Sequence, residues 1–392
     1  MREDIRKAFQ KVGASVPNLL MPQKKYDLQK FAVIACDQFS AKPEYWEEVE
    51  RFAKGAPSAL NMIIPEAWLK KEASAAERVC DAMEGYLANG VFRETGEELI
   101  FVKRETSAGI RKGLIIALDL ENYDFSKNSK SMIRATEATV VDRLPARVEI
   151  RRGAPLEMPH IIVLLDDRRD TLMSFIDENS FSLSLEYNFT LMQGGGGIQG
   201  FGINDNDMLL RIANIMGKLL DASPDGMLYA MGDGNHSFAA AKQYWDEIKP
   251  GLALEERENH PARFALCELV NLYDSAMAFE PIHRALLGVD VKKVQSEVGF
   301  DAKNPPELQE LQPLLDEWLA KNPQAELEYI HGSEECEALC AAPDRLAIIM
   351  PPFDKGGLFD TVRRDGAYVR KSFSIGCARD KRYYLECRKI KA

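Results

Sequence analysis

The amino-acid sequence predicts an α+β fold for this 392-residue chain. Apolar runs bounded by turn residues alternate with segments of helical periodicity along the chain. The order of these elements is mixed and forms no regular βαβ repeat, so mixed sheets are favoured over a purely parallel one. At 46% hydrophobic residues, the composition supplies enough apolar side chains for a core.

The N-terminal part predicts a strand, two helices and a hairpin. Residues 31–39 form an apolar run that leads into a polar turn. Residues 43–54 have helical spacing with a proline in the first turn, and residues 65–90 continue as helix up to a terminal glycine. Two β-rich runs around a glycine-containing loop predict a hairpin over residues 99–121.

The middle of the chain predicts strands and helices in alternation. A buried apolar run at 158–167 and an alternating pattern at 181–193 predict two strands. Apolar residues at helical spacing predict a helix over 206–222. A strand over 226–232 and a helix over 237–248 then flank the short polar segment Gly-Asp-Gly-Asn-His-Ser.

The C-terminal part predicts a further mixture of strands and helices. Residues 263–274 form an apolar run, residues 310–322 a helix, residues 346–353 a strand, and residues 372–390 a last hairpin. The segment GGGGIQG at 194–200 predicts a mobile loop and not a dinucleotide-binding turn, because the next helical pattern begins several residues too late.

Charge and cysteine content limit the classes of function. The formal net charge is −11 and the pI about 5.2, which argues against general nucleic-acid binding because that needs a basic footprint. No run approaches the ~20 apolar residues that span a bilayer, and the charged N-terminus does not resemble a signal peptide. Seven scattered cysteines favour reduced thiols over disulfides. We therefore expect a cytoplasmic protein without membrane or nucleic-acid partners, and a homo-oligomer stays open.

The segment Gly-Asp-Gly-Asn-His-Ser at 232–237 predicts an anion-binding loop. Strand, glycine-rich loop and helix follow one another, so the loop lies at a helix N-terminus, where unpaired N–H groups and the helix dipole attract anions. Asn235, His236 and Ser237 can each donate a hydrogen bond, and Asp233 can hold a magnesium ion or a substrate hydroxyl. The simpler alternative is a strand-to-helix turn with a polar N-cap.

Four segments of the chain resemble a bacterial and archaeal family, the domain of unknown function 1015. GDGNHSFAAAK (232–242) resembles its Asp-Gly-His-His-Arg loop, and IRATEATVVDR (133–143) resembles its Arg-His-Glu-x-Thr segment. FEPIHRALL (279–287) and YVRKSFSIG (368–376) resemble its Pro-x-His-Arg and Pro-Lys-Ser-Thr-x-Phe segments. Order and spacing agree over nearly the whole chain.

The resemblance implies a nucleotide-binding core. The family's loop is similar to the phosphate loop of the ParB/sulfiredoxin fold, and Gly234 and Ala240 match that pattern. The arginine of the loop is Ser237 here, which removes a bidentate phosphate partner, and the histidine of the Arg-His-Glu segment is Ala135. Free-serine kinases of the same broad fold carry a similar loop, so the resemblance implies nucleotide or phosphate binding and suggests a small-molecule kinase.

The expected architecture has two domains. Residues 1–250 would form the ParB/sulfiredoxin-like core with an N-terminal extension. Residues 251–392 would form an α+β domain that contributes residues to a shared cleft.

Two further segments supply candidate residues. In the first, Arg134 and Arg143 can replace the positive charge lost at Ser237, and Glu137 can act as a general base. In the second, His283 can transfer a proton and Arg284 can bind phosphate. The alternatives are a solvated charge cluster and a histidine–arginine pair with local hydrogen bonds. The candidate set is then catalytic Glu137, His236 and His283, metal-binding Asp233, and phosphate-binding Gly232, Asp233, Gly234, Asn235, His236, Ser237, Arg134, Arg143 and Arg284.

Three hypotheses for the function follow from these residues. In the leading one, the loop holds the phosphates of ATP or ADP with Mg²⁺, and a small hydroxylated metabolite such as a free amino acid receives the phosphoryl group. In the second, the protein binds a nucleotide or metabolite as a sensor without turnover. In the third, the motif residues are only turn chemistry in a protein that binds a structural partner.

Overall fold

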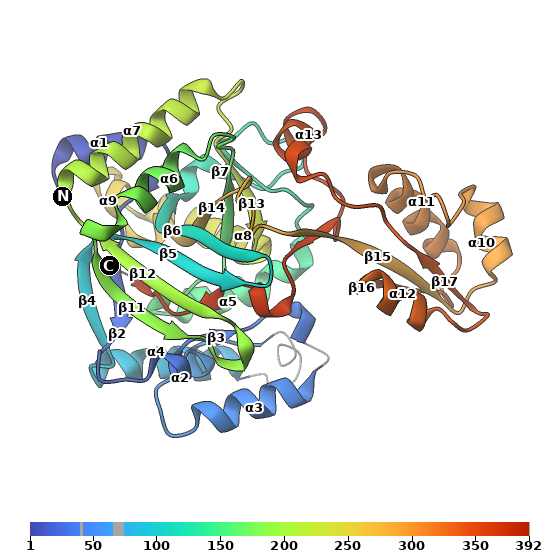
Figure 1. Cartoon of the computed structure of the whole chain (residues 1–392), viewed down its shortest axis with the longest axis horizontal. Helices are drawn as coiled ribbons and strands as arrows, with labels where there is room; N and C mark the ends of the chain where they lie inside the picture. Colours follow the sequence, from blue (N-terminus) through green and yellow to red (C-terminus); the bar gives the residue numbers. More distant parts are fainter. Residues whose placement is uncertain (40–41, 66–73, 392) are drawn as a thin grey trace.

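The computed structural model describes residues 1–39, 42–65 and 74–391. A large mixed sheet forms the main body, with helices on both faces, and a smaller sheet with its own helices extends to one side (Figure 1). This arrangement confirms the predicted α+β class. The described part of the chain contains no helix that is long and apolar enough to cross a bilayer.

The large sheet is predominantly antiparallel with a parallel portion at one side. Pairing is parallel between β10 and β14, between β13 and β8 and between β8 and β7, and antiparallel elsewhere. The strand β1 (Ala14–Ser15) pairs with β6 beside the main path. In spatial order the other strands are β11 (Ser184–Thr190), β12 (Gly197–Ile203), β5 (Leu99–Thr106), β6 (Gly109–Asp119), β14 (Phe264–Asn271), β10 (Ile162–Leu165), β13 (Tyr229–Asp233), β8 (Ile133–Arg134) and β7 (Tyr123–Asp124).

Alternate residues of the strands face two separate hydrophobic cores. In β5, Leu99 and Phe101 join one core while Ile100 and Val102 join the other, as the two-residue period of a strand requires. The first core packs under α1 (Glu3–Lys11), α5 (Leu144–Gly153), α6 (Thr171–Glu178), α7 (Asn206–Ala222) and α8 (Asn235–Ile248). The second packs against α2 (Leu28–Phe31), α3 (Pro43–Ala53), α4 (Ala75–Ala88) and the C-terminal tail, at the bottom of Figure 1.

A smaller sheet is built around the strand β15 (Phe279–Leu287). Its antiparallel partners are β16 (Glu326–His331), β17 (Arg345–Ile348) and β18 (Phe373–Ile375). The remaining helices are α9 (Leu254–Asn259), α10 (Val291–Val298), α11 (Leu308–Lys321), α12 (Ser333–Leu339) and α13 (Leu358–Asp365). The strand β14 follows residue 250 and yet lies inside the large sheet, and the domain boundary at that residue stays a prediction.

The structure confirms some expected elements and corrects others. The hairpin over 99–121 is the antiparallel pair β5–β6, and the helix over 206–222 is α7. The segment 194–200 is not a free loop, because Gly197 begins β12, where Gly200 gives the Tyr187 ring room to pack. The C-terminal hairpin is also wrong: β18, β19 (Tyr383–Tyr384) and β20 (Arg388–Lys389) pair with β15, β3 (Val33–Ile34) and β9 (Leu156–Glu157) instead of with one another. Part of the helix expected over 65–90 lies outside the described residues.

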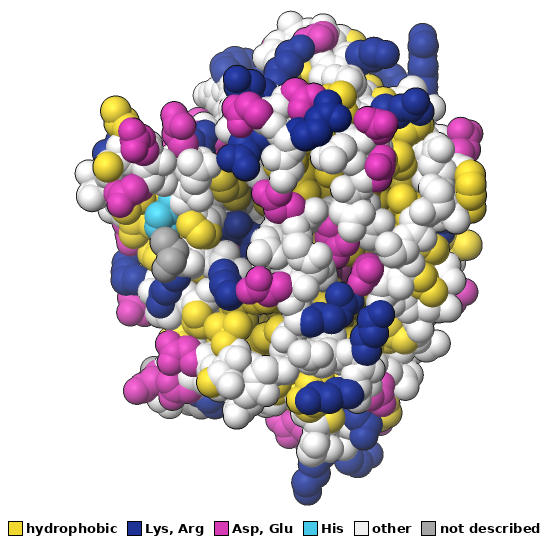
Figure 2. Space-filling model, turned by 90° about the vertical axis from the view of Figure 1, so that its left-hand side faces the viewer, with side chains coloured by type: hydrophobic (Ala, Val, Ile, Leu, Met, Phe, Trp, Pro, Cys, Tyr) yellow, Lys and Arg dark blue, Asp and Glu magenta, His cyan; other side chains and the backbone are white. Residues whose placement is uncertain are grey.

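Charged side chains are mixed over the face of the molecule shown in Figure 2. Lysine and arginine side chains lie there among aspartate and glutamate side chains. This view contains no broad basic surface of the kind that nucleic-acid binding needs.

Buried arginines attach the C-terminal segment to the large sheet. Arg104 of β5 donates hydrogen bonds to the carbonyl groups of Arg379 and Lys381, and Arg111 of β6 donates to the carbonyl of Asp380. Burial lowers the pKa of Arg104 to about 9, which leaves its guanidinium charged at neutral pH. The segment that precedes β19 is therefore fixed by charge-assisted hydrogen bonds in addition to apolar packing.

The turn between β13 and α8 requires glycine. Gly234 has a φ of +77°, and a Cβ atom there would lie 3.0 Å from Cγ1 and 3.1 Å from Cα of Ile161. Gly226 has a similar φ of +76°, but a Cβ atom there would meet nothing within 4 Å. The two glycines share the same left-handed backbone conformation and differ in how closely another segment, at Ile161, approaches them.

We predict that Gly234→Ala costs more stability than Gly226→Ala. Both substitutions place a non-glycine residue in the left-handed region, at a cost of about 1 kcal/mol, and only the first also forces Ile161 to move. Urea unfolding of the two variants measures the difference. Equal losses would contradict the close approach of Gly234 to Ile161.

Glu98 is a buried carboxyl group that precedes β5. Its side chain is 2% exposed, and its Oε1 has no hydrogen-bond partner within the described part of the chain. Burial raises the pKa of Glu98 to about 7 from a usual value of 4.5. The folded state therefore holds this proton more tightly than the unfolded state does.

We predict that this carboxyl group makes folding more stable at lower pH. Because the folded pKa lies above the unfolded one, its contribution increases as pH falls through about 7 and is lost as pH rises. Between pH 8 and pH 5.5, wild type should gain about 2 kcal/mol relative to Glu98→Gln, which cannot titrate. Chemical unfolding of both proteins at the two pH values measures this, and parallel pH profiles would contradict it.

Candidate functional site

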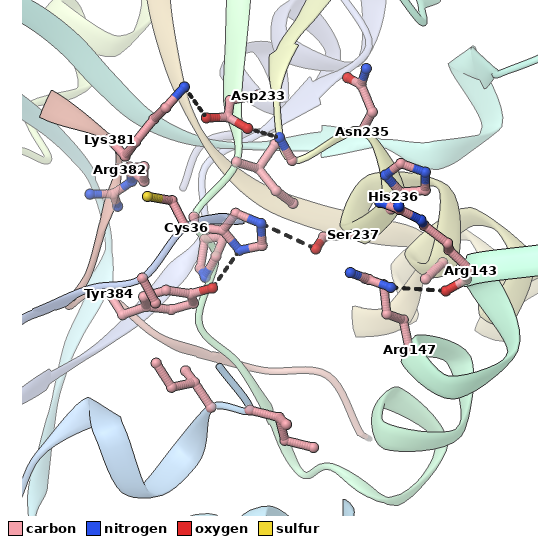
Figure 3. Close-up of a pocket in the computed structure, with 18 of the residues that line it drawn as sticks. Cys36, Arg143, Arg147, Asp233, Asn235, His236, Ser237, Lys381, Arg382 and Tyr384 are labelled. Atoms are coloured by element: carbon pink, nitrogen blue, oxygen red, sulfur yellow. Dashed lines mark hydrogen bonds and ion pairs between the residues drawn. The ribbon is translucent and has the colours of Figure 1, made fainter. Parts of the chain in front are cut away.

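A cavity of about 550 Å³ lies where the β13–α8 loop meets α5 and the C-terminal segment (Figure 3). The whole loop 232–237 lines it, together with Glu137 and Arg143 from the segment that follows β8. The C-terminal segment contributes Lys371, Ser374, Lys381, Arg382 and Tyr384, and the smaller sheet contributes Tyr329 and His331. We call this space the central cavity.

The N-terminus of α8 points into the central cavity. The strand β13 ends at Asp233, Gly234 makes the turn, and the helix begins at Asn235, two residues earlier than its sequence pattern predicts. The amide of Phe238 makes the first helical bond, to the carbonyl of Gly234. The N–H groups of the preceding helical residues thus lie at the positive end of the helix dipole, where an anion is stabilised.

The lining of the central cavity is basic although the protein is acidic. Three acidic side chains among the described residues line it, namely Glu137, Glu157 and Asp233. The basic lining residues outnumber them and are Arg143, Arg147, Arg151, Arg370, Lys371, Lys381 and Arg382. Several of these basic side chains form ion pairs, among them Arg151 with Glu157, Arg370 with Asp316, and Arg382 with Glu386. Basic side chains thus outnumber acidic ones in the lining, in a chain whose net charge is −11.

Arg143 and Arg147 lie close to the first turn of α8. Figure 3 shows both side chains next to His236, with Arg147 donating a hydrogen bond of 3.0 Å to the carbonyl of Arg143. They come from the start of α5, which packs along α8. Two arginines thus stand near the helix N-terminus, where Ser237 occupies the position at which the resemblance expects arginine.

Asp233 is already engaged by groups of the protein. Its Oδ1 accepts the N–H of Gly234 at 2.7 Å, and its Oδ2 lies 3.4 Å from Nζ of Lys381. A magnesium ion at this carboxylate would be repelled by the ammonium group, and the described residues contain no cluster of three potential metal ligands. The residues present do not fit the expected magnesium site at Asp233.

Glu137 is held by the backbone of the C-terminal segment. Its Oε1 accepts the N–H groups of Ser372 and Phe373 at 2.7 and 3.3 Å, and its Oε2 accepts the N–H of Lys371 at 3.3 Å. Burial raises the pKa of Glu137 above its usual value, and these hydrogen bonds oppose that rise. The carboxylate is thus fixed in position at the wall of the central cavity.

His236 projects from the first turn of α8. Its Nε2 accepts the N–H of Val140 at 3.3 Å, which orients the ring toward the segment that contains Glu137 and Arg143. The neutral ring then carries its proton on Nδ1.

Three predicted site residues do not line the central cavity. Arg134 is buried, with its guanidinium 2.7 Å from a carboxylate oxygen of Asp225. His283 is buried in β15, where its Nδ1 accepts the N–H of Met350. Arg284 is buried beside it and donates to Gln312 and to the carbonyl of Arg370, so it supports the wall instead of forming it.

Sequence reasoning missed many residues of the site, and four of them matter most for its chemistry. Arg147, His160, Lys381 and Tyr384 line the central cavity, but the sequence marks none of them with a motif. His160 offered the clearest signal, since it is one of only five histidines and lies near the start of the apolar run 158–167. Lys381 and Tyr384 reach the site through the path of the C-terminal segment, which local patterns do not reveal.

Comparison with solved structures finds distant similarities. A mutant free serine kinase in complex with AMP has 12% identity and a TM-score of 0.41, covering 71% of this chain and 91% of that one. Another mutant, in complex with ADP, has 13% identity and a TM-score of 0.40, covering 71% and 92%. A conserved hypothetical protein from Pyrococcus furiosus has 14% identity and a TM-score of 0.35, covering 71% and 95%.

Comparison of sequences identifies the family. No curated protein matches the chain significantly. A family model described as "Protein of unknown function (DUF1015)" matches residues 20–339, which is most of the chain and includes the β13–α8 loop. This match confirms the resemblance found in the sequence motifs, and the chain belongs to the DUF1015 family.

Proposed function

We propose that the protein binds a nucleotide or a related phosphorylated small molecule in the central cavity. The observation that carries the proposal is the convergence of the α8 N-terminus with Arg143 and Arg147 on one space. Backbone N–H groups, the helix dipole and guanidinium groups are the donors that phosphate uses in proteins. The size of the cavity, about 550 Å³, lies in the usual range for small-molecule sites.

The charge of the protein supports a selective pocket for an anion. A chain with a net charge of −11 repels anions over most of its surface, so a basic cavity localises the attraction. Asp233 and Lys381 form an ion pair at the edge of the loop, and Arg143 and Arg147 line the cavity beside the first turn of α8.

In the catalytic form of this proposal, the protein transfers a phosphoryl group to a small hydroxylated metabolite. Glu137 is the candidate base, because burial raises its pKa toward neutral pH, and a general base works best when its pKa is close to the pH of the reaction. The arginines would stabilise the charge on the transferred phosphoryl group.

A second candidate function is a sensor that binds the ligand without turnover. Two observations favour it: Ser237 stands in place of the loop arginine, and Lys381 engages the carboxylate expected to hold magnesium. A sensor would return the nucleotide intact, whereas a kinase would consume it in the presence of an acceptor. Nucleotide turnover with a panel of hydroxylated amino acids therefore distinguishes the two.

We predict that nucleotides or inorganic phosphate raise the melting temperature of the wild-type protein. The double variant Arg143→Ala/Arg147→Ala should bind these ligands at least about tenfold more weakly. Thermal shift measurements with ATP, ADP, CTP and phosphate, each with and without Mg²⁺, test this. Arg152→Ala is the matched control, since Arg152 lies on the same helix but outside the cavity, where it pairs with Glu149 and Glu247. No shift with any of these ligands would contradict the proposal.

We predict that turnover, if it is catalysed through Glu137, rises with pH as this carboxyl group loses its proton. Because its pKa is raised, the midpoint should lie above the usual value of 4.5. Glu137→Gln should lower kcat by about 10²-fold or more, flatten this limb of the profile and leave nucleotide binding nearly unchanged. Turnover assays between pH 4 and pH 8 measure it, and an unchanged kcat would remove Glu137 as the base.

A further inference from the structure

Three side chains that line the central cavity form a continuous hydrogen-bonded chain. The hydroxyl of Tyr384 lies 2.7 Å from Nδ1 of His160, and Nε2 of the same ring lies 3.4 Å from Oγ of Ser237. Figure 3 shows both interactions as dashed lines that end on one imidazole ring. Neither His160 nor Tyr384 belongs to a motif that the sequence analysis singled out.

The fold fixes each member of this chain from a different element. Ser237 lies in the first turn of α8, His160 lies two residues before the start of β10, and Tyr384 lies in β19. The rings of His160 and Tyr384 also pack against each other, with centroids 5.3 Å apart. The imidazole is thus held between a hydroxyl that orients it and a hydroxyl that faces the cavity.

We propose that Ser237 is a nucleophile that accepts a phosphoryl group from the ligand, with His160 as its base and Tyr384 as a positioning residue. This inference rests on the proposed function, since it uses the same phosphate site. A serine, a histidine within hydrogen-bond reach and a third group that orients the ring are the arrangement by which a hydroxyl is activated.

The protonation states follow from the contacts. When Nδ1 of His160 carries the proton and donates it to the oxygen of Tyr384, Nε2 holds a lone pair and accepts from Ser237. Oγ of Ser237 then attacks phosphorus, its proton passes to Nε2, and the bond from phosphorus to the leaving oxygen breaks. The electron pair of that bond stays on the leaving oxygen, so a phosphate anhydride such as ATP yields ADP and phosphoserine.

The reverse use of the same groups completes a double displacement. Water or an acceptor hydroxyl attacks the phosphorus of the phosphoserine, and the bond from phosphorus to Oγ of Ser237 breaks. Oγ takes back the proton held on Nε2 of His160, and the attacking oxygen passes its own proton to solvent water. Both the phosphorylated serine and the transferring group carry negative charge at the start of α8. The helix dipole and the guanidinium groups of Arg143 and Arg147 stabilise that charge.

The serine that stands in place of the loop arginine has a chemical role in this proposal. At this position an arginine would neutralise phosphate, whereas Ser237 offers an oxygen that can bond to phosphorus. Arg143 and Arg147 supply positive charge from α5 instead.

The test is covalent labelling of the full-length protein with ATP, followed by acid-stable phosphopeptide mapping and intact mass measurement. We expect a single added phosphoryl group on Ser237 in wild type and none in Ser237→Ala. Labelling should slow by about 10²-fold or more in His160→Gln, because proton transfer by a positioned base contributes a factor of that order. Tyr384→Phe should slow it less and shift its pH dependence, since this variant removes only the group that orients the ring.

Ser174→Ala is the matched control, because Ser174 is also a half-buried, hydrogen-bonded serine early in a helix but lies outside the central cavity. Its labelling should equal that of wild type. If ATP raises the melting temperature of both wild type and Ser237→Ala, but wild type gains no phosphoserine, this inference is overturned and the proposed function stands. Absence of both shift and label would overturn both.

Discussion

The central cavity depends on the hydrogen bonds that buried arginines of the large sheet make to the C-terminal segment. Arg104 and Arg111 hold the backbone at residues 379–381, which lies just before the lining residue Tyr384 in the sequence. These hydrogen bonds fix the backbone from which Lys381 contacts Asp233 and Tyr384 contacts His160. Breaking such a buried, charge-assisted contact leaves an uncompensated charge, which costs several times more than a surface ion pair.

In the proposed site, the arginine missing from the loop has its counterpart on a neighbouring helix. The loop carries Ser237 where its family pattern has arginine, and α5 brings Arg143 and Arg147 to the same end of α8. The positive potential around a helix N-terminus depends on where charges lie in space and not on the segment that supplies them. A sequence motif that requires arginine at one position therefore does not detect positive charge that another segment brings to the same place.

The sequence revealed elements whose signals are local, and it missed contacts that depend on the path of the chain. The helix α7 was predicted to its end residues because its apolar spacing runs unbroken from the N-cap at Asp205. The strand β12 was missed because its glycines suit a loop equally well, and close neighbours across the sheet, such as the ring of Tyr187 at Gly200, explain them. Likewise, no local pattern could bring Tyr384 to His160, because the two residues are 224 positions apart in the sequence.

The strand β15 belongs to the smaller sheet and also pairs with β18, which lines the central cavity. Its first residues, Phe279 to Pro281, pair with β18, and from Ile282 onward it pairs with β16, which contributes Tyr329 and His331 to the cavity. The exchange of partners occurs next to a proline, which has no N–H to give to either neighbour. Because β18 and β16 pair with successive parts of one strand, a tilt of the smaller sheet would move Tyr329 and His331 relative to Ser374 and would change the width of the central cavity.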